Sequence, residues 1–288
     1  MAANIPGQKL PAGLYFIATP IGAARDITLR ALDILRTADV IAAEDTRSLR
    51  HLMDIHGVAL GDRPLLSYHD HNGERVRPRI LAALAEGRSV AYASEAGTPL
   101  VADPGYQLGA AAIAAGQVVT AAPGPSAVLA ALTVSGLPSD RFLFAGFAPN
   151  AGGQRRRWLE EIGGIPATLI LYESPKRINA LLGDMASVLG AERRIAVCRE
   201  LTKKFEEVTR GSVAEVAEAF DGRAVKGEIV VLVDRARGVA AAEADIETAL
   251  REALSCQSVK DAAASVAELT GAPKREVYQL ALKLAGGN

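Results

Sequence analysis

Five Gly/Pro-rich corners hold most of the residues in this sequence that could bind a ligand. They are 18–22 (ATPIG), 94–105 (SEAGTPLVADPG), 123–127 (PGPSA), 172–177 (YESPKR) and 226–228 (KGE), and we expect each to follow a strand. Open α/β sheets bind ligands outside the carboxyl ends of their strands. Gly lets the main chain approach a ligand there, and Pro fixes the loop. One such corner is usually just a turn, but five at the same end of strands predict a binding site.

The motifs of the common nucleotide-binding and hydrolytic enzymes do not occur. The sequence contains no GxGxxG, GxxxxGK[ST], HExxH or GxSxG, so it gives no support to an NAD enzyme, a P-loop NTPase, a zincin or an α/β-hydrolase. The two cysteines, Cys198 and Cys256, form neither a CxxC nor a Cys/His cluster. His69, Asp70 and His71 alternate in a way that could present metal ligands on one face. Because no third ligand cluster accompanies them, we predict no metal site.

Short apolar runs alternating with amphipathic segments must position these corners. Strands are predicted at 13–19, 40–43, 65–68, 89–93, 118–121, 142–146, 167–172, 194–199, 206–209 and 228–233. Helices are predicted at 26–37, 47–55, 76–85, 106–115, 155–162, 175–189 and 212–220, with three more at 246–254, 258–269 and 274–284. The alternation indicates α/β layers with largely parallel pairing. The last three helices have the outline of a helix-turn-helix, although a structural cap on the α/β body is an equal interpretation.

Length and composition set the outer limits of the interpretation. The 288 residues suffice for two ordinary domains, and 49% apolar with 23% charged residues is typical of a globular protein. We expect an α/β domain at 1–122, a second at 123–235, a linker at 236–244 and a helical domain at 241–288. Lys and Arg total 32 against 33 acidic residues, which excludes a protein that binds polyanions over its whole surface. Because neither a membrane-length apolar run nor a signal peptide is found, we expect a cytoplasmic protein.

Taken together, the corners resemble the tetrapyrrole methylase superfamily of S-adenosylmethionine-dependent methyltransferases. Within it, the sequence is most similar to members that methylate the ribose 2′-oxygen of a cytidine in small-subunit (16S) ribosomal RNA. The similarity runs in order along the whole chain, through TPIGAARDIT, AEDTR, LLSYHDHN, SEAGTPLVADPGY, PGPSA, GLPSDRF, YESPKR, RELTK and KGE. The sequence departs from the family pattern at three positions: it has Glu95 where the family usually has Asp, Ala102 where the family has a small polar residue, and Ala23 where the family has Asn.

The resemblance implies two α/β domains that meet over a cleft, with S-adenosylmethionine held between them, and a homodimer. It also favours a substrate-facing or structural role for 69–71. The residues that it assigns to the methyl donor are Pro20, Gly97, Thr98, Pro99, Val101, Ser126, Ala127, Tyr172, Leu201 and Gly227. An adenosyl cofactor needs an apolar slot with a few polar contacts, and a domain junction supplies both.

Methyl transfer to a ribose hydroxyl needs alignment and a proton acceptor. A sulfonium methyl donor is already activated and requires no metal, whereas a protonated 2′-hydroxyl is a poor nucleophile. Carboxylates at strand ends and in the corners are candidate bases: Asp45, Glu95 and Asp103 first, with Glu44, Glu173 and Glu200 behind them. Each could instead cap a helix or pair with an arginine, and Asp103, just before Pro104, could be an N-cap.

An RNA substrate must find local positive charge on a near-neutral chain. The expected RNA contacts are Arg155, Arg156, Arg157, Lys203, Lys274 and Arg275. Further clusters lie at 75–79, 176–177 and 203–204, and any of them could be a solvated face. Trp158 could stack a base, but we favour it as the apolar anchor of its helix.

Two other functions remain open. One is a methyltransferase of the same superfamily that acts on a tetrapyrrole or another small substrate, against which stand the TPIG corner and the helical tail. The other is a non-catalytic regulator that binds nucleic acid through that tail. This last function leaves the Gly/Pro corners unexplained.

Overall fold

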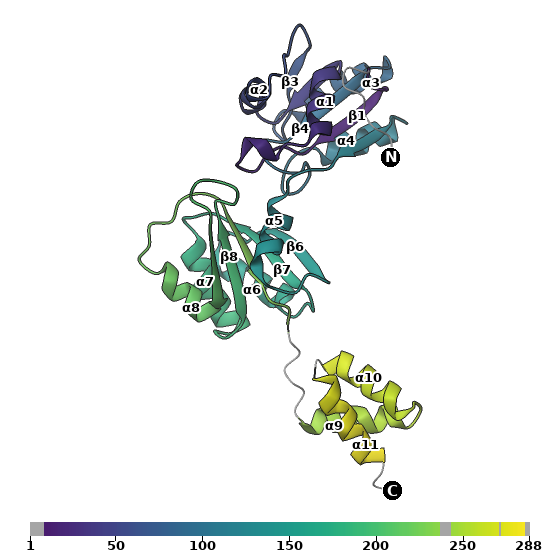
Figure 1. Cartoon of the computed structure of the whole chain (residues 1–288), viewed down its shortest axis with the longest axis vertical. Helices are drawn as coiled ribbons and strands as arrows, with labels where there is room; N and C mark the ends of the chain where they lie inside the picture. The colour runs from purple at the N-terminus through teal and green to yellow at the C-terminus, as the bar shows by residue number, and fades with distance from the viewer. Residues whose placement is uncertain (1–8, 237–242, 271, 286–288) are drawn as a thin grey trace.

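The computed structural model describes residues 9–236, 243–270 and 272–285 (Figure 1). In these residues the chain forms two five-stranded sheets, one after the other, and then three helices. None of the helices in these ranges is both long and apolar enough to cross a membrane. The predicted linker at 236–244 and the first eight residues lie largely or wholly outside the described residues.

The first sheet is parallel throughout, as predicted. Its strands run in the order β3-β2-β4-β1-β5, and each neighbouring pair is parallel. The strands are β1 (Gly13–Ile17), β2 (Val40–Ala43), β3 (Leu65–Ser67), β4 (Ser89–Ala93) and β5 (Val119–Ala122). Because all five point the same way, the segments that follow β1, β2, β4 and β5 lie along one edge of the sheet.

Helices cover both faces of this sheet. The alternation of β1 decides the layers: Tyr15 and Ile17 pack beneath α1 (Leu29–Thr37) and α2 (Thr46–Ile55), which follow the short 3-10 turn η1 (Ala24–Asp26). Leu14 and Phe16 face α3 (Gly73–Ala85) and α4 (Tyr106–Ala114) on the other side. The three central strands β1, β2 and β4 are therefore buried on both faces, which explains why they are almost entirely apolar.

The second sheet is mixed, so the prediction of largely parallel pairing is wrong for this half. Its order is β6-β7-β10-β8-β9, and only β6 and β7 pair in parallel. The strands are β6 (Phe142–Phe147), β7 (Thr168–Glu173), β8 (Arg194–Arg199), β9 (Glu207–Ser212) and β10 (Ile229–Val233). A short loop joins β8 to β9, and such a connection permits only antiparallel pairing. The last strand, β10, then inserts between β7 and β8, antiparallel to both.

One face of the second sheet carries α6 (Gly152–Gly163), α7 (Ile178–Leu189) and α8 (Val213–Phe220). The other face carries α5 (Ala127–Ser135), which the sequence pattern did not predict. Val128, Ala131 and Leu132 of α5 pack on this sheet, and Ile21 and Val101 from the first half join the same cluster. The helix lacks a polar stripe because its surroundings are apolar on most sides, and helical periodicity is then weak.

The three C-terminal helices match their prediction closely. They are α9 (Glu243–Leu254), α10 (Val259–Thr270) and α11 (Lys274–Ala285). Leu250, Val266 and Val277 close a small core of their own, and Figure 1 shows the three helices set apart from the two sheets. The Gly predicted to stop α10 is residue 271, outside the described residues. The domain limits 1–122, 123–235 and 241–288 stay predictions.

Candidate active site

A cavity of about 470 Å³ lies where the two halves of the chain meet, and we call it the junction cavity. All five predicted corners contribute to its wall. Their contributions are Ile21, then Glu95, Ala96 and Val101–Asp103, then Ala127, then Tyr172–Pro175, and finally Gly227 and Glu228. The convergence expected from the corners is therefore present in the structure.

The KGE corner lies at the cavity although it precedes its strand in the chain. It was expected to follow a strand, but residues 226–228 precede β10. In the sheet, Ile229 pairs with Glu173 at the carboxyl end of β7 and with Arg199 at the carboxyl end of β8. Because β10 runs antiparallel to both, its amino end lies at the edge where the other corners lie.

Two loops at the cavity hold strained backbone. Leu100 (φ 73°), Ala102 (φ 62°), Glu200 (φ 52°) and Thr202 (φ 63°) are the non-glycine residues with positive φ in the described part of the chain. Such a conformation costs about 1–2 kcal/mol per residue and clusters at functional sites. Val101 lies between the first pair and Leu201 between the second, and both line the cavity. The strained backbone thus fixes these two apolar side chains in the wall.

Side-chain ties between the two halves hold these loops. The Ala23 amide donates to the Thr202 hydroxyl over 3.1 Å. A Cβ on Gly22 would lie 2.5 Å from that hydroxyl oxygen, so the first corner can approach the Thr202 loop only as glycine. On the second sheet, the Glu228 amide donates to a carboxylate oxygen of Glu200 (3.0 Å), and the Glu200 amide donates back to the Glu228 carbonyl (3.0 Å).

Five of the ten predicted donor residues line the cavity: Val101, Ala127, Tyr172, Leu201 and Gly227. Two others tie the corners together behind it. Gly97 exchanges two backbone hydrogen bonds with Thr19 (2.9 and 3.0 Å), and the Thr98 hydroxyl donates to the Pro125 carbonyl (2.8 Å). The remaining three, Pro20, Pro99 and Ser126, do not line the cavity. Each is adjacent in sequence to a residue that lines it or that bonds another corner.

The three predicted catalytic carboxylates differ sharply in their surroundings. Asp45 caps α2, since it accepts from the Arg47 and Ser48 amides, and it also pairs with the Arg47 guanidinium. These bonds lower its pKa to about 2, so Asp45 is a weak base in a structural position. Glu95 lies in the cavity wall, where its amide donates to Glu44 (3.2 Å).

The carboxyl group of Asp103 has a raised pKa. Burial, and after it the charge of Glu44, raise its pKa to about 7. Asp103 also lines a second and larger cavity, of about 890 Å³, formed by residues 68–77 and 103–107 of the first half. We call this the first-sheet cavity. Among the described lining residues, Asp103 alone belongs to both cavities.

Two of the three remaining carboxylate candidates, Glu173 and Glu200, are engaged in ion pairs. The Glu173 side chain is fully buried and pairs with Arg177. Glu200 pairs with Lys203, which also bonds Glu228 (2.9 Å). Lys203, predicted to contact RNA, therefore supports the cavity wall. Burial, and after it the charge of Asp103, raise the pKa of the Tyr172 hydroxyl to about 12.

An aromatic stack holds the turn that carries Asp103. Tyr92 packs edge-on between Tyr68 and Phe16, with ring centroids 5.7 and 5.6 Å apart, and its hydroxyl donates to the Pro104 carbonyl (3.2 Å). A Cβ on Gly105 would come within 3.1 Å of the Tyr92 ring. This stack presses directly on the turn and so positions Asp103 and Tyr106 on either side of it.

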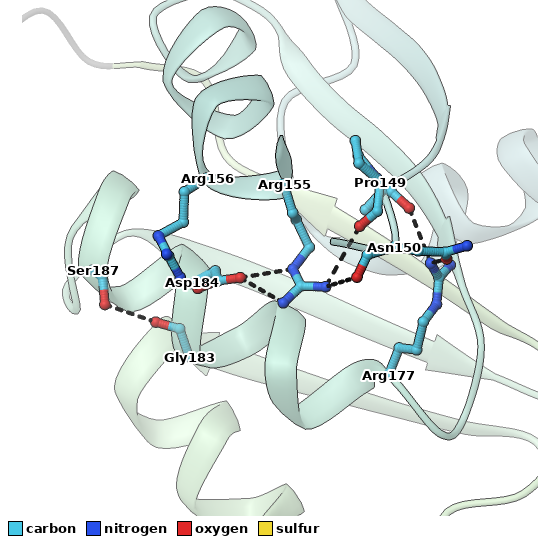
Figure 2. Close-up of polar contacts among 9 residues, drawn as sticks. Pro149, Asn150, Arg155, Arg156, Arg177, Gly183, Asp184 and Ser187 are labelled. Carbon is cyan, nitrogen blue, oxygen red and sulfur yellow. Dashed lines mark hydrogen bonds and ion pairs between the residues drawn. The ribbon is translucent and has the colours of Figure 1, made fainter. Parts of the chain in front are cut away.

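The predicted arginine cluster on α6 is largely structural. Figure 2 shows Arg155 and Arg156 pointing toward Asp184 of α7, with dashed bonds to its carboxylate. The Arg155 side chain is only 7% exposed and lies 2.6 Å from Asp184, so we withdraw it as an RNA contact. Arg156 shares Asp184 but is half-exposed, and Arg157 is exposed. Trp158 packs against the core of the second half, as favoured above.

Lys274 and Arg275 are exposed at the start of α11. Sequence reasoning missed Tyr106 and noted Arg75 and Arg77 only as one of several basic clusters. All three line the first-sheet cavity, together with Asp70 and His71. The position of Tyr106 directly after the Asp103–Gly105 turn was the one signal in the sequence. The sequence does not show whether the ring of such a residue is exposed or buried.

Comparison with known proteins agrees with this architecture. Residues 13–217 match the family described as Tetrapyrrole (Corrin/Porphyrin) Methylases, and residues 240–285 match a domain described as the RsmI C-terminal HTH domain. The chain therefore belongs to the tetrapyrrole methylase family. The predicted fold class, α/β halves with a helical tail, and the predicted family are confirmed.

Similar proteins match nearly the whole chain. A protein of Mesorhizobium japonicum named ribosomal RNA small subunit methyltransferase I is 48% identical over 98% of this chain and 95% of its own length. One of Escherichia coli O157:H7 with the same name is 42% identical over 99% and 98%. Among solved structures, a conserved hypothetical protein from Aeropyrum pernix K1 superposes with a TM-score of 0.61 at 19% identity, covering 96% of this chain and 98% of that one.

Proposed function

We propose that this chain transfers a methyl group from S-adenosylmethionine to the ribose 2′-hydroxyl of a cytidine in small-subunit (16S) ribosomal RNA. The observation that carries this proposal is the junction cavity, which joins an apolar wall to a base-like carboxylate, Asp103, at the meeting point of five loops. Family membership supports the donor, and the names of the whole-length relatives support the substrate.

The residues around the junction cavity fit a sulfonium donor. Ile21, Val101 and Leu201 supply apolar surface, while Glu44, Glu95 and Glu228 place negative charge around it. A sulfonium cation favours that combination, because carboxylates attract the charge and apolar walls exclude water. When bound, the donor supplies an already activated methyl group. We assign contact to Val101, Ala127, Tyr172, Leu201 and Gly227, and wall support to Pro20, Gly97, Thr98, Pro99 and Ser126.

Asp103 is the side chain to which we assign proton removal. As a carboxylate it accepts the proton of the attacking hydroxyl, and a pKa near 7 leaves it ionised in about half of the molecules at neutral pH while still basic enough to help. Glu95 and Glu44 keep that pKa from falling, since their charges oppose ionisation of Asp103. The other work of the site is alignment of hydroxyl and methyl group.

An RNA substrate is favoured over a tetrapyrrole by the C-terminal helices. The solved cobalt precorrin-4 methyltransferase and the methyltransferase CobJ cover 77% and 78% of this chain, although 94% and 95% of their own lengths are matched. The relatives named ribosomal RNA small subunit methyltransferase I match 98% and 99% of this chain, so their match includes the C-terminal helices. We propose that Lys274, Arg275 and Arg157 contact RNA phosphates, and that 1–122, 123–235 and 241–288 are the domains.

We also propose a cytoplasmic homodimer that needs no metal. An rRNA substrate supports the location, and sulfonium chemistry needs no metal. Phe142 on β6, an edge strand, is 44% exposed, and an exposed aromatic residue on a strand edge favours pairing with another chain.

Mass spectrometry of nucleosides from 16S rRNA tests the proposal. Cells that lack this protein should lose one 2′-O-methylcytidine, and the wild-type gene should restore it. Asp103→Asn, produced at the same level, should not. If the methylated cytidine persists in the deletion strain, the substrate assignment is wrong; if a methylated tetrapyrrole is lost instead, the small-substrate alternative holds.

A further inference from the structure

The first-sheet cavity is lined by none of the residues that we assign to the methyl donor, and it is the larger of the two. At about 890 Å³ it is within the range of cavities that hold organic ligands, about 300–1,000 Å³. It meets the junction cavity at Asp103. A substrate seated there would present its reacting atom to the same carboxylate that faces the donor side.

The wall of this cavity combines the side chains that recognise an unpaired nucleotide. Tyr106 is 73% exposed at the first turn of α4, and an exposed aromatic ring on a cavity wall is a stacking surface for a base. Arg75 is exposed on the opposite segment, and Arg77 is held between the Tyr68 hydroxyl and the Gln107 side chain. Of the five N–H donors of the Arg77 guanidinium, these two bonds engage the one on Nε and one of the two on Nη2.

Carboxylates on the same wall restrict which base fits. Asp70 and Glu74 line the cavity beside these arginines. A carboxylate accepts a hydrogen bond from an exocyclic amine, as on cytosine, and repels the carbonyl oxygen that uracil has at that position. The wall thus contains donors for a phosphate or a base carbonyl oxygen, acceptors for an amine, and a stacking ring.

We propose that the first-sheet cavity receives one unstacked, amine-bearing nucleotide of the RNA, with its base on Tyr106 and its ribose at Asp103. This inference rests on the proposed function and assigns the substrate subsite within it. The donor and the nucleotide then occupy separate cavities and meet at Asp103.

Methyl transfer to small ribosomal subunits from cells that lack this protein tests the subsite in the full-length chain. Tyr106→Ala should lower kcat/KM for the subunit about tenfold or more, because a base–aromatic stack contributes about that much. Tyr106→Phe keeps the ring and should stay within about twofold of wild type. Ile113→Ala, on the same helix and 64% exposed but outside the cavity, is the matched control and should have no effect.

Calorimetry with S-adenosylmethionine separates the two cavities. Donor affinity should be unchanged in Tyr106→Ala, and in Arg75→Gln, whose loss of transfer should come with a weaker dependence on salt. Full activity of both variants, or an equal loss of donor affinity, would overturn the subsite. A wild-type chain that binds donor but methylates no ribosomal RNA would instead refute the proposed function.

Discussion

Burial and the nearby charge of Glu44 raise the pKa of Asp103 to about 7, whereas capping bonds lower that of Asp45 to about 2. Two aspartates that look equivalent in sequence therefore differ in pKa. Asp45 caps a helix, and Asp103 is the carboxylate that we propose as the proton acceptor.

The first prediction concerns pH. Because Asp103 must be ionised to act, kcat/KM should rise with pH through about 7 and then level off. Glu44→Gln removes a negative charge that raises this pKa, so the rise should move to lower pH. Single-turnover methyl transfer between pH 5.5 and 8.5 measures both profiles. A profile that is flat through pH 7, or one that Glu44→Gln leaves in place, would contradict the assignment.

The second prediction concerns stability at the same residue. The pKa of Asp103 is raised on folding, so its contribution to stability is present below about pH 4 and is lost as pH rises through about 7. Asp103→Asn stays neutral and should raise the free energy of unfolding at pH 8 by about 1–2 kcal/mol after allowance for partial exposure, with little change at pH 4. Urea denaturation at the two pH values checks this. Glu95→Gln should have a smaller effect in the same direction, because the charge of Glu95 is a lesser cause of the raised pKa of Asp103.

At the scale of elements, the loops at the junction cavity keep strained backbone in place. The third prediction is that Ala102→Gly relieves the left-handed conformation at that exposed residue and raises the free energy of unfolding by up to about 1 kcal/mol. The same change loosens the loop that carries Val101, so donor affinity should fall several-fold. Thermal melting and calorimetry measure the two effects. A gain in stability with no loss of affinity would show that the strain has no role in binding.

The fourth prediction concerns Gly227. Its φ is +93°, and a Cβ there would collide with the Glu200 side chain, which bonds Glu228 and Lys203. Gly227→Ala should therefore reduce donor affinity at least tenfold by displacing this loop. Truncating the partner in Gly227→Ala/Glu200→Ala should recover part of that loss, since the collision is removed while the backbone strain remains. No recovery in the double variant would mean that the methyl group blocks the donor directly.

At the scale of the whole molecule, the C-terminal helices form a unit around their own core. The fifth prediction is that a chain ending at Arg235, which keeps the Arg235–Asp140 ion pair, melts within a few degrees of wild type and binds the donor. Methylation of small subunits should drop at least tenfold, because phosphate contacts at Lys274 and Arg275 are lost.

Charge reversal provides the matched test in the full chain. Lys274→Glu/Arg275→Glu should reproduce the loss of transfer without changing the melt. A truncated chain that melts many degrees lower and loses donor binding would show instead that the helices cap the body.

Much of the architecture follows from local pattern. Apolar runs of four to six residues between amphipathic segments are sufficient to predict the strands, and the five Gly/Pro corners indicate which ends carry the site. The pattern did not predict α5, because a helix packed on most sides loses the polar stripe that marks it. It also did not reveal the antiparallel insertion of β10, because strand order depends on contacts between segments far apart in the chain.

The sequence by itself determined the family, the corners that build the site and the kinds of side chain they contain. Only the tertiary structure decided the partners and the burial of those side chains. Arg155 is an internal ion-pair partner because α7 places Asp184 beside it. Residues 226–228 lie at the site because β10 is antiparallel to β7 and β8. The pKa of Asp103, which we propose as the base, is raised because burial between two cavities, which no neighbour in sequence encodes, opposes its charge. Burial and through-space charge belong to the packed molecule, so the chemistry of a residue is set there.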